Sequence, residues 1–127
     1  MGIYLSLLLA ATGSIANPEA NYLLHCGGCH RADASGVPPS VPPLAGTLGA
    51  IIATPEGRDY VVRVPGASQT PLSDEELAAV MNWVLVTFNT ETLPADFKPL
   101  SGREVGRSRK QVLADPQKMR EALWPGY

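Results

Sequence analysis

The residues of this chain that could do chemistry are concentrated in one pentapeptide, Cys26-Gly27-Gly28-Cys29-His30. Thiols at this spacing lie about one helical turn apart, so each can add to a vinyl group on one edge of a porphyrin. The adjacent imidazole then lies under the iron, and the glycines let the backbone pass close to the ring. The pattern predicts one covalent haem c bonded through Cys26 and Cys29, with His30 as the proximal iron ligand.

Zinc binding, thiol redox chemistry and a structural disulfide explain this motif less well than haem attachment does. The motif uses both cysteines of the chain. A zinc site needs a full tetrahedral ligand set, and ligands packed into residues 25–30, including His25, could not surround one metal ion. A thioredoxin-like pair requires a strand–helix context and gains nothing from His30. A disulfide closing so small a loop would be strained.

The length and composition fit one domain, with a hydrophobic core that the side chains alone do not complete. The chain has 127 residues, of which 45% are hydrophobic and only 6% aromatic, with a formal charge of −2. No apolar run reaches the roughly 18 residues of a membrane-spanning helix, which excludes a polytopic membrane protein. A pI near 5.6 without a basic stripe on the main body argues against a nucleic-acid partner. A haem would supply the apolar surface that the scarce aromatic residues do not.

The N-terminus has the features of an export signal. Residues 3–11 form an apolar stretch of signal-peptide length, and Ser14-Ile15-Ala16 offers small residues at a cleavage site. No Lys or Arg precedes Arg31, so the usual positive start is missing. We expect residues 1–16 to be a signal peptide and the protein to be periplasmic, with no stable membrane insertion after cleavage.

Helix signals flank the motif on both sides. Asn17-Pro18 is a typical N-cap followed by proline at the first helical position, which predicts a helix leading into the motif. Ser73 and Glu76 form a capping box before apolar residues at helical spacing from Leu77 to Phe88. Residues 57–64 alternate poorly and fit either a short helix or a strand. The chain is therefore expected to be all-α.

The motif and these elements make the chain similar to class I monohaem c-type cytochromes, over roughly residues 17–88. The resemblance implies a small helical fold around one covalent haem. It implies that the carbonyl of Pro42 accepts a hydrogen bond from His30 and that Leu44 packs on the porphyrin face. It also implies that Tyr22 packs against the last core helix. By analogy with such sites, Arg58 and Tyr60 are candidate donors to the haem propionates.

The second axial ligand of the iron is not evident from the sequence. In the resembling family a methionine from the loop before the last helix usually takes this role, but residues 61–72 contain neither Met nor His. Met81 is the tentative distal ligand, although its place on the apolar stripe also suits a core residue. Met119, His25, water or an unusual donor are the alternatives.

Residues 91–127 form a C-terminal extension beyond the cytochrome domain expected at residues 17–90. Ser101 can cap a helix over residues 103–113, and Asp115-Pro116 can begin another that ends at Leu123. Residues 98–127 carry seven basic and three acidic side chains, against three and nine in residues 1–97. The extension either packs on the domain or docks a partner through Arg107, Arg109 and Lys110.

These features predict a single-electron carrier, not an enzyme, that works between periplasmic redox partners. A periplasmic dehydrogenase and a terminal acceptor are the kinds of partner expected. One alternative is a high-spin haem protein whose open distal site binds small ligands such as CO, NO, O2 or peroxide. Another is a fixed cytochrome subunit of a larger dehydrogenase complex.

Overall fold

A computed structural model describes residues 16–125, and these residues form a set of helices without a sheet. The expectation of an all-α fold is confirmed. The signal peptide expected at residues 1–16 lies, except for its last residue, outside the described part. Within that part, no helix has both the length and the apolar character needed to cross a membrane. The helices are α1 (Pro18–His25), α2 (Gly27–His30), α3 (Leu48–Ile51), α4 (Pro55–Arg63), α5 (Pro65–Ser68), α6 (Asp74–Phe88), α7 (Gly102–Ser108) and α8 (Pro116–Leu123).

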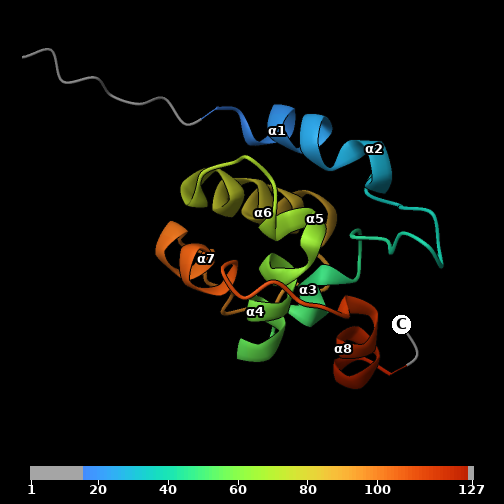
Figure 1. Cartoon of the computed structure of the whole chain (residues 1–127). Coiled ribbons are helices and arrows are strands. Elements are labelled where there is room, and N and C mark those ends of the chain that lie inside the picture. Colours follow the sequence, from blue (N-terminus) through green and yellow to red (C-terminus); the bar gives the residue numbers. More distant parts are fainter. Residues whose placement is uncertain (1–15, 126–127) are drawn as a thin grey trace, which may run out of the picture.

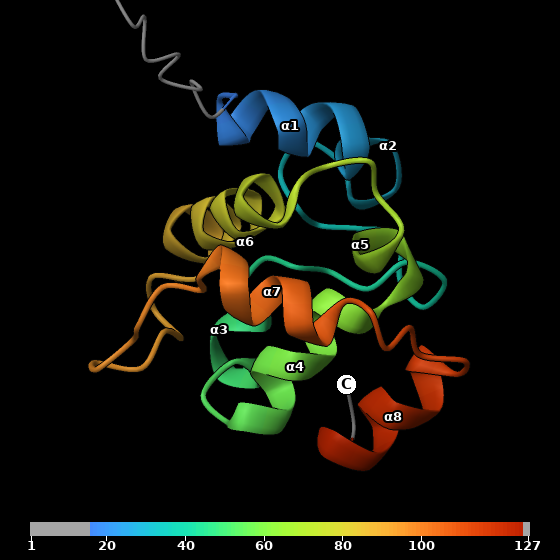
Figure 2. The ribbon, with the colours of Figure 1, turned by 60° about the vertical axis from the view of Figure 1, so that its left-hand side comes forward.

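The longest helix, α6, lies in the middle of the fold. Figures 1 and 2 show α1 and α2 on one side of α6 and α7 on the other, with α4 and α8 further from α1. The residues from α2 to α3 run as a long irregular loop along one side of the molecule. The haem motif therefore lies at one end of the layered arrangement, and the C-terminal extension covers the other.

The predicted capping box fixes the start of α6. The hydroxyl of Ser73 accepts a hydrogen bond from the Glu76 backbone N–H at 3.1 Å, and the Glu76 carboxylate accepts from the Ser73 N–H at 2.9 Å. These reciprocal bonds satisfy backbone donors that a helix start leaves unpaired. One face of the helix is buried, and it consists of Leu77, Ala78, Val80, Met81, Val84 and Leu85.

Helix α1 is held against α6 by an aromatic cluster. The Asn17 side chain accepts from the Glu19 N–H at 2.9 Å, as expected for an N-cap. The ring of Tyr22 is fully buried, with its centroid 5.3 Å from that of Trp83 and 6.2 Å from that of Phe88. The packing of Tyr22 against the last core helix is the contact that the resemblance implies.

Of the two alternatives for residues 57–64, helix is correct, since α4 covers most of this segment. Thr54 caps it by accepting from the Gly57 N–H at 3.1 Å. Gly57 leaves room for the carbonyl of Ile51, which a Cβ atom would strike. Close packing of α3 on α4 depends on this glycine, a requirement that helix periodicity does not reveal.

The C-terminal extension packs on the core and is part of it. Leu100, Val105 and Leu113 are buried. The side chain of Asn82 on α6 bonds both the N–H and the carbonyl of Leu100, at 2.8 and 2.9 Å. The expected helix over residues 103–113 is shorter than predicted, because α7 ends at Ser108. The helix expected at Asp115-Pro116 is confirmed as α8.

An arginine–carboxylate pair joins the extension to α4. The Nε and Nη2 atoms of Arg58 donate to the two oxygens of Glu104 at 2.7 and 2.9 Å. Both side chains are about three-quarters buried, which makes this pair more favourable than an exposed one. Hydrogen bonding to Arg58, opposed by partial burial, holds the pKa of Glu104 below its usual range.

We predict that Glu104→Gln weakens folding at neutral pH by roughly 1 kcal/mol, the upper range for a partly exposed ion pair. A carboxylate with a lowered pKa stabilises the fold above its unfolded pKa of about 4.3 and stops doing so as the pH falls through the lower folded value. Urea unfolding measured between pH 3 and pH 7 should therefore show a shallower loss of stability in the variant. Glu56→Gln, at an exposed position of α4, is the control. Equal effects of both substitutions would contradict the role of the Arg58–Glu104 pair.

Candidate haem site

The backbone places the two thiols around one helical turn. The N–H of Cys26 bonds the Tyr22 carbonyl at 2.8 Å as α1 ends, and the N–H of His30 bonds the Cys26 carbonyl at 2.9 Å as α2 forms. Cys26 is half-buried against the core, Cys29 is exposed, and both thiols are free. Burial, and to a lesser degree Cys29, raises the pKa of the Cys26 thiol. The motif thus has one half-buried thiol, on Cys26, and one exposed thiol, on Cys29.

The imidazole of His30 is oriented by a backbone carbonyl. Its Nδ1 lies 3.0 Å from the carbonyl oxygen of Pro42. Because a carbonyl can only accept, Nδ1 carries the proton and Nε2 keeps a lone pair for a metal. Burial lowers the pKa of His30, and the hydrogen bond to Pro42 opposes this shift. The neutral ring, which is the form that ligates iron, is therefore favoured.

The loop that supplies this carbonyl is braced by its own backbone. The Gly36 N–H donates to the His30 carbonyl at 2.9 Å, and Val37 and Val41 exchange two hydrogen bonds of 2.9 Å. Gly36 has a φ of +64°, and a Cβ atom there would lie 2.6 Å from the Val41 carbonyl oxygen and 2.7 Å from that of Pro42. Only glycine fits against the carbonyl that orients His30.

Tyr22 forms a hydrogen bond with the backbone at the C-terminal end of the motif. Its hydroxyl donates to the Arg31 carbonyl at 2.7 Å, directly after His30. Burial, followed by the nearby Cys26 and Asp33, raises the pKa of Tyr22 to about 12. The hydroxyl therefore stays protonated over the physiological range and keeps donating this bond.

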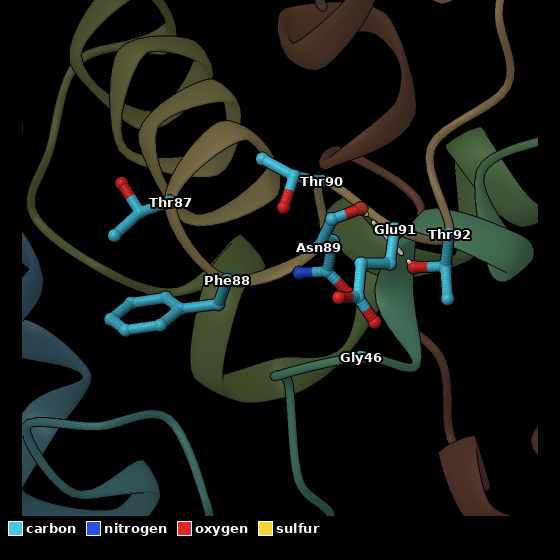
Figure 3. Close-up of a pocket in the computed structure, with 7 residues that line it drawn as sticks. All are labelled: Gly46, Thr87, Phe88, Asn89, Thr90, Glu91 and Thr92. Carbon is cyan, nitrogen blue, oxygen red and sulfur yellow. Dashed lines mark hydrogen bonds between the residues drawn. The ribbon is translucent and has the colours of Figure 1, made fainter.

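The end of the loop is joined to the end of α6 beside a small cavity of about 270 Å³ (Figure 3). The Gly46 N–H donates to the Phe88 carbonyl at 2.9 Å. The buried side chain of Asn89 accepts from the Gly49 N–H at 3.1 Å and donates to the Val84 carbonyl at 3.3 Å. Leu44, two residues before Gly46, is half-buried and packs against the core. The loop is thus fixed at both ends around its central prolines.

Arg58 and Tyr60 lie where the extension meets α4. Besides Glu104, the Arg58 guanidinium donates to the Lys98 carbonyl at 2.8 Å. The Tyr60 ring is buried, and its centroid lies 5.5 Å from that of the Trp124 ring. These contacts engage both residues with the extension and do not favour the propionate role, which stays a prediction.

The two described methionines are both associated with the packed core. Met81 is 8% exposed on the buried face of α6, and Met119 of α8 is partly buried against the same cluster. Both side chains have the burial expected of core residues. The distal role of Met81 therefore stays a prediction that its burial does not favour.

The sequence left open whether Arg109 packs on the domain or docks a partner, and it gave no sign of the contacts that this residue makes in the structure. In the structure its side chain is only 12% exposed and bonds the segment between α5 and α6. It is therefore not available to a partner. Its acceptors are mainly backbone carbonyls, which leave no trace in the sequence pattern.

The residues present fit a haem. The thiols of Cys26 and Cys29 are free, and the Nε2 atom of His30 is available beside them. In addition, the side chains of Asn21 and Ser68 are each 9% exposed, and each has a buried polar atom without a hydrogen-bond partner in the described residues. Buried polar groups without partners are uncommon in a completed fold, and they are consistent with a missing polar cofactor or bound water. A porphyrin brings its own four nitrogen donors, so a single histidine suffices to anchor the iron.

A helical chain with this motif and an oriented histidine defines a c-type haem protein, and comparison with known proteins agrees. A cytochrome c-552 of Thermus thermophilus is 31% identical over 137 residues, covering 89% of this chain and 93% of that protein. A second cytochrome c-552 from Thermus thermophilus is 32% identical over 124 residues, covering 79% and 95% respectively. No family model matches the chain. The chain belongs to the class I c-type cytochrome family, and its cofactor is one covalently attached haem c.

The two matches also differ from this chain in length. Since 89% of 127 residues is about 113, the 137-residue match includes about 24 residues that this chain lacks. The second match gives about the same difference, because 79% of 127 is about 100 out of 124. As residues 1–90 cannot supply 113, the first match also extends into residues 91–127.

We predict that Gly36→Ala displaces the Pro42 carbonyl and thereby loosens His30. Gly46→Ala is the matched control, because Gly46 also has a positive φ, of +73°, but a Cβ atom there meets nothing within 4 Å. Thermal unfolding should show a cost of about 1 kcal/mol for Gly46→Ala from the backbone conformation alone, and about 2–4 kcal/mol for Gly36→Ala. Only Gly36→Ala should raise the reduction potential, since a weaker hydrogen bond makes the imidazole a poorer donor to the ferric iron. Equal effects on stability and potential would refute the steric argument.

Proposed function

We propose that this protein carries single electrons between exported redox proteins, with Cys26 and Cys29 holding the haem and His30 ligating its iron. The observation that carries the proposal is the 3.0 Å bond from His30 to Pro42, beside two free thiols at haem-attachment spacing. When bound, the haem supplies the one-electron redox chemistry. The curated relatives, both named cytochrome c-552, support the same function.

The contribution of the chain is to keep the proximal side of the site fixed. The bond to Pro42 orients the imidazole, and the backbone bonds of Gly36, Val37 and Val41 hold that carbonyl in place. A ligand that does not reorient when the iron changes charge adds little reorganisation to electron transfer. We propose that Leu44, which follows Pro42 closely and packs against the core, excludes water from the ring.

The exposure of the motif determines how a partner could approach. Cys29 and Gly28 are exposed, and Leu23 and Leu24 on the preceding helix are 49% and 76% exposed. We infer that electrons enter and leave near the thioether edge, where an apolar surface can meet a partner without desolvating charge. A periplasmic dehydrogenase and a terminal acceptor remain the kinds of partner proposed, and the periplasm the proposed location.

A second candidate function is the binding of a small ligand at the distal face of the haem. It is favoured by the connection between α5 and α6, which in the resembling family would supply methionine but here contains neither Met nor His. A distal face without a strong protein ligand would admit CO or cyanide without unfolding.

The proposed iron ligation is tested by comparing the two histidines of the chain. His30→Ala should abolish the wild-type haem spectrum and shift or eliminate the reversible one-electron step in a potentiometric titration. His25→Ala, five residues earlier at the end of α1, should leave the spectrum and the potential within error of wild type. Both variants should retain haem after denaturation if the thioether bonds form. A wild-type spectrum in His30→Ala would overturn the proposal.

A further inference from the structure

Arg109 is the residue directly after α7. Its guanidinium donates hydrogen bonds to several acceptors in the segment that leads from α5 into α6. Its Nε and Nη2 donate to the Ser68 carbonyl at 3.2 and 3.1 Å, and Nη2 also donates to the Thr70 carbonyl at 2.8 Å. Its Nη1 donates to the Leu72 carbonyl at 2.8 Å and to the Asp74 carboxylate at 3.2 Å. A planar guanidinium can bridge several acceptors in one fixed geometry, which a lysine ammonium does not reproduce.

The bridged segment depends on this contact for its shape. It is irregular between Ser68 and Asp74, with local bonds from the Thr70 N–H to the Ala67 carbonyl at 3.3 Å and from the Leu72 N–H to the Thr70 hydroxyl at 3.0 Å. Three of its carbonyls converge on the guanidinium. Without Arg109 these acceptors would lose partners in a partly buried setting, which costs more than the net value of an exposed hydrogen bond.

The close approach of the extension is built into the sequence at Gly106. A Cβ atom at this position would collide with the carboxylate of Asp74. Gly106 is buried, and it lies three residues before Arg109 on the same helical stretch. The absence of a side chain at Gly106 therefore lets α7 come near enough to the start of α6 for Arg109 to reach its acceptors.

The same segment lies next to the elements that carry the haem motif. In Figures 1 and 2 the connection from α5 to α6 runs on the side of α6 that faces α1 and α2. Ser68, whose carbonyl receives two bonds from Arg109, also has a buried hydroxyl with no hydrogen-bond partner in the described residues. A buried hydroxyl held in this way is suited to meet a polar group or a water molecule that the protein alone does not supply.

We propose that Arg109 is a positioning residue, which holds the α5–α6 connection and Ser68 over the haem face opposite His30 and so limits the access of small ligands to the iron. The inference rests on the proposed function. It goes beyond that function by assigning control of the distal face to a residue of the C-terminal extension. The extension thereby influences the distal side of the haem through Arg109.

The test compares Arg109→Lys with Arg63→Lys in the holoprotein. Arg63 is a matched control because it also joins the extension to the core, donating to the Gln111 carbonyl at 2.6 Å and to Asp59 at 2.8 Å, but from α4. Arg109→Lys should speed cyanide binding to the ferric protein at least tenfold. It should also speed amide hydrogen exchange of residues 69, 70 and 72 at least tenfold. Arg63→Lys should change neither rate by more than twofold.

Faster exchange without faster cyanide binding would place the segment away from the iron and overturn the proposal. Unchanged exchange, or equal effects of Arg63→Lys, would overturn it as well. If Arg109→Lys does not fold, Asp74→Ala, which removes one of the five contacts, should change both rates in the same direction by a smaller factor, and no change would be a refutation. A failure of the iron ligation itself would be seen separately in the His30→Ala spectrum.

Discussion

The hydrogen bond between His30 and the carbonyl of Pro42 sets the geometry on which the rest of the structure depends. A ring held at one nitrogen can present the other to iron in only a narrow range of directions, so the carbonyl has to be fixed as well. This requirement accounts for the glycine at position 36 and for the paired bonds between Val37 and Val41. It also accounts for the link from Gly46 to the end of α6, which ties the loop to the longest helix.

On the opposite side of the fold, the C-terminal extension contributes side chains to the hydrophobic core. The extension inserts Leu100, Val105 and Leu113 into the core, and Arg58 and Arg109 bind it to different elements. The positive charge of residues 98–127 is therefore not one uniform surface. Arg109 serves packing, whereas Arg103, Arg107 and Lys110 are exposed and can act on a partner.

Much of the fold follows from local signals in the sequence. The caps at Asn17, Ser73 and Asp115 are confirmed, because each depends on a side chain that bonds its own helix start. The haem motif is equally local, whereas the role of the Pro42 carbonyl was implied only by the resemblance to the family. The helix at residues 57–64 could not be distinguished from a strand, since its burial depends on α3 and the extension. The end of α7 at Ser108 and the carbonyl partners of Arg109 arise from tertiary packing, which residue spacing does not encode.

The most direct measurement is the absorption spectrum of the oxidised protein from the visible to the near infrared, repeated after reduction. A covalent haem held by His30, with its other face covered by a segment without methionine, predicts a c-type reduced spectrum. It also predicts that the weak sulfur-to-iron charge-transfer band is absent from the oxidised protein. The presence of that band would contradict this arrangement, because it would show that a methionine such as Met81 or Met119 binds the iron.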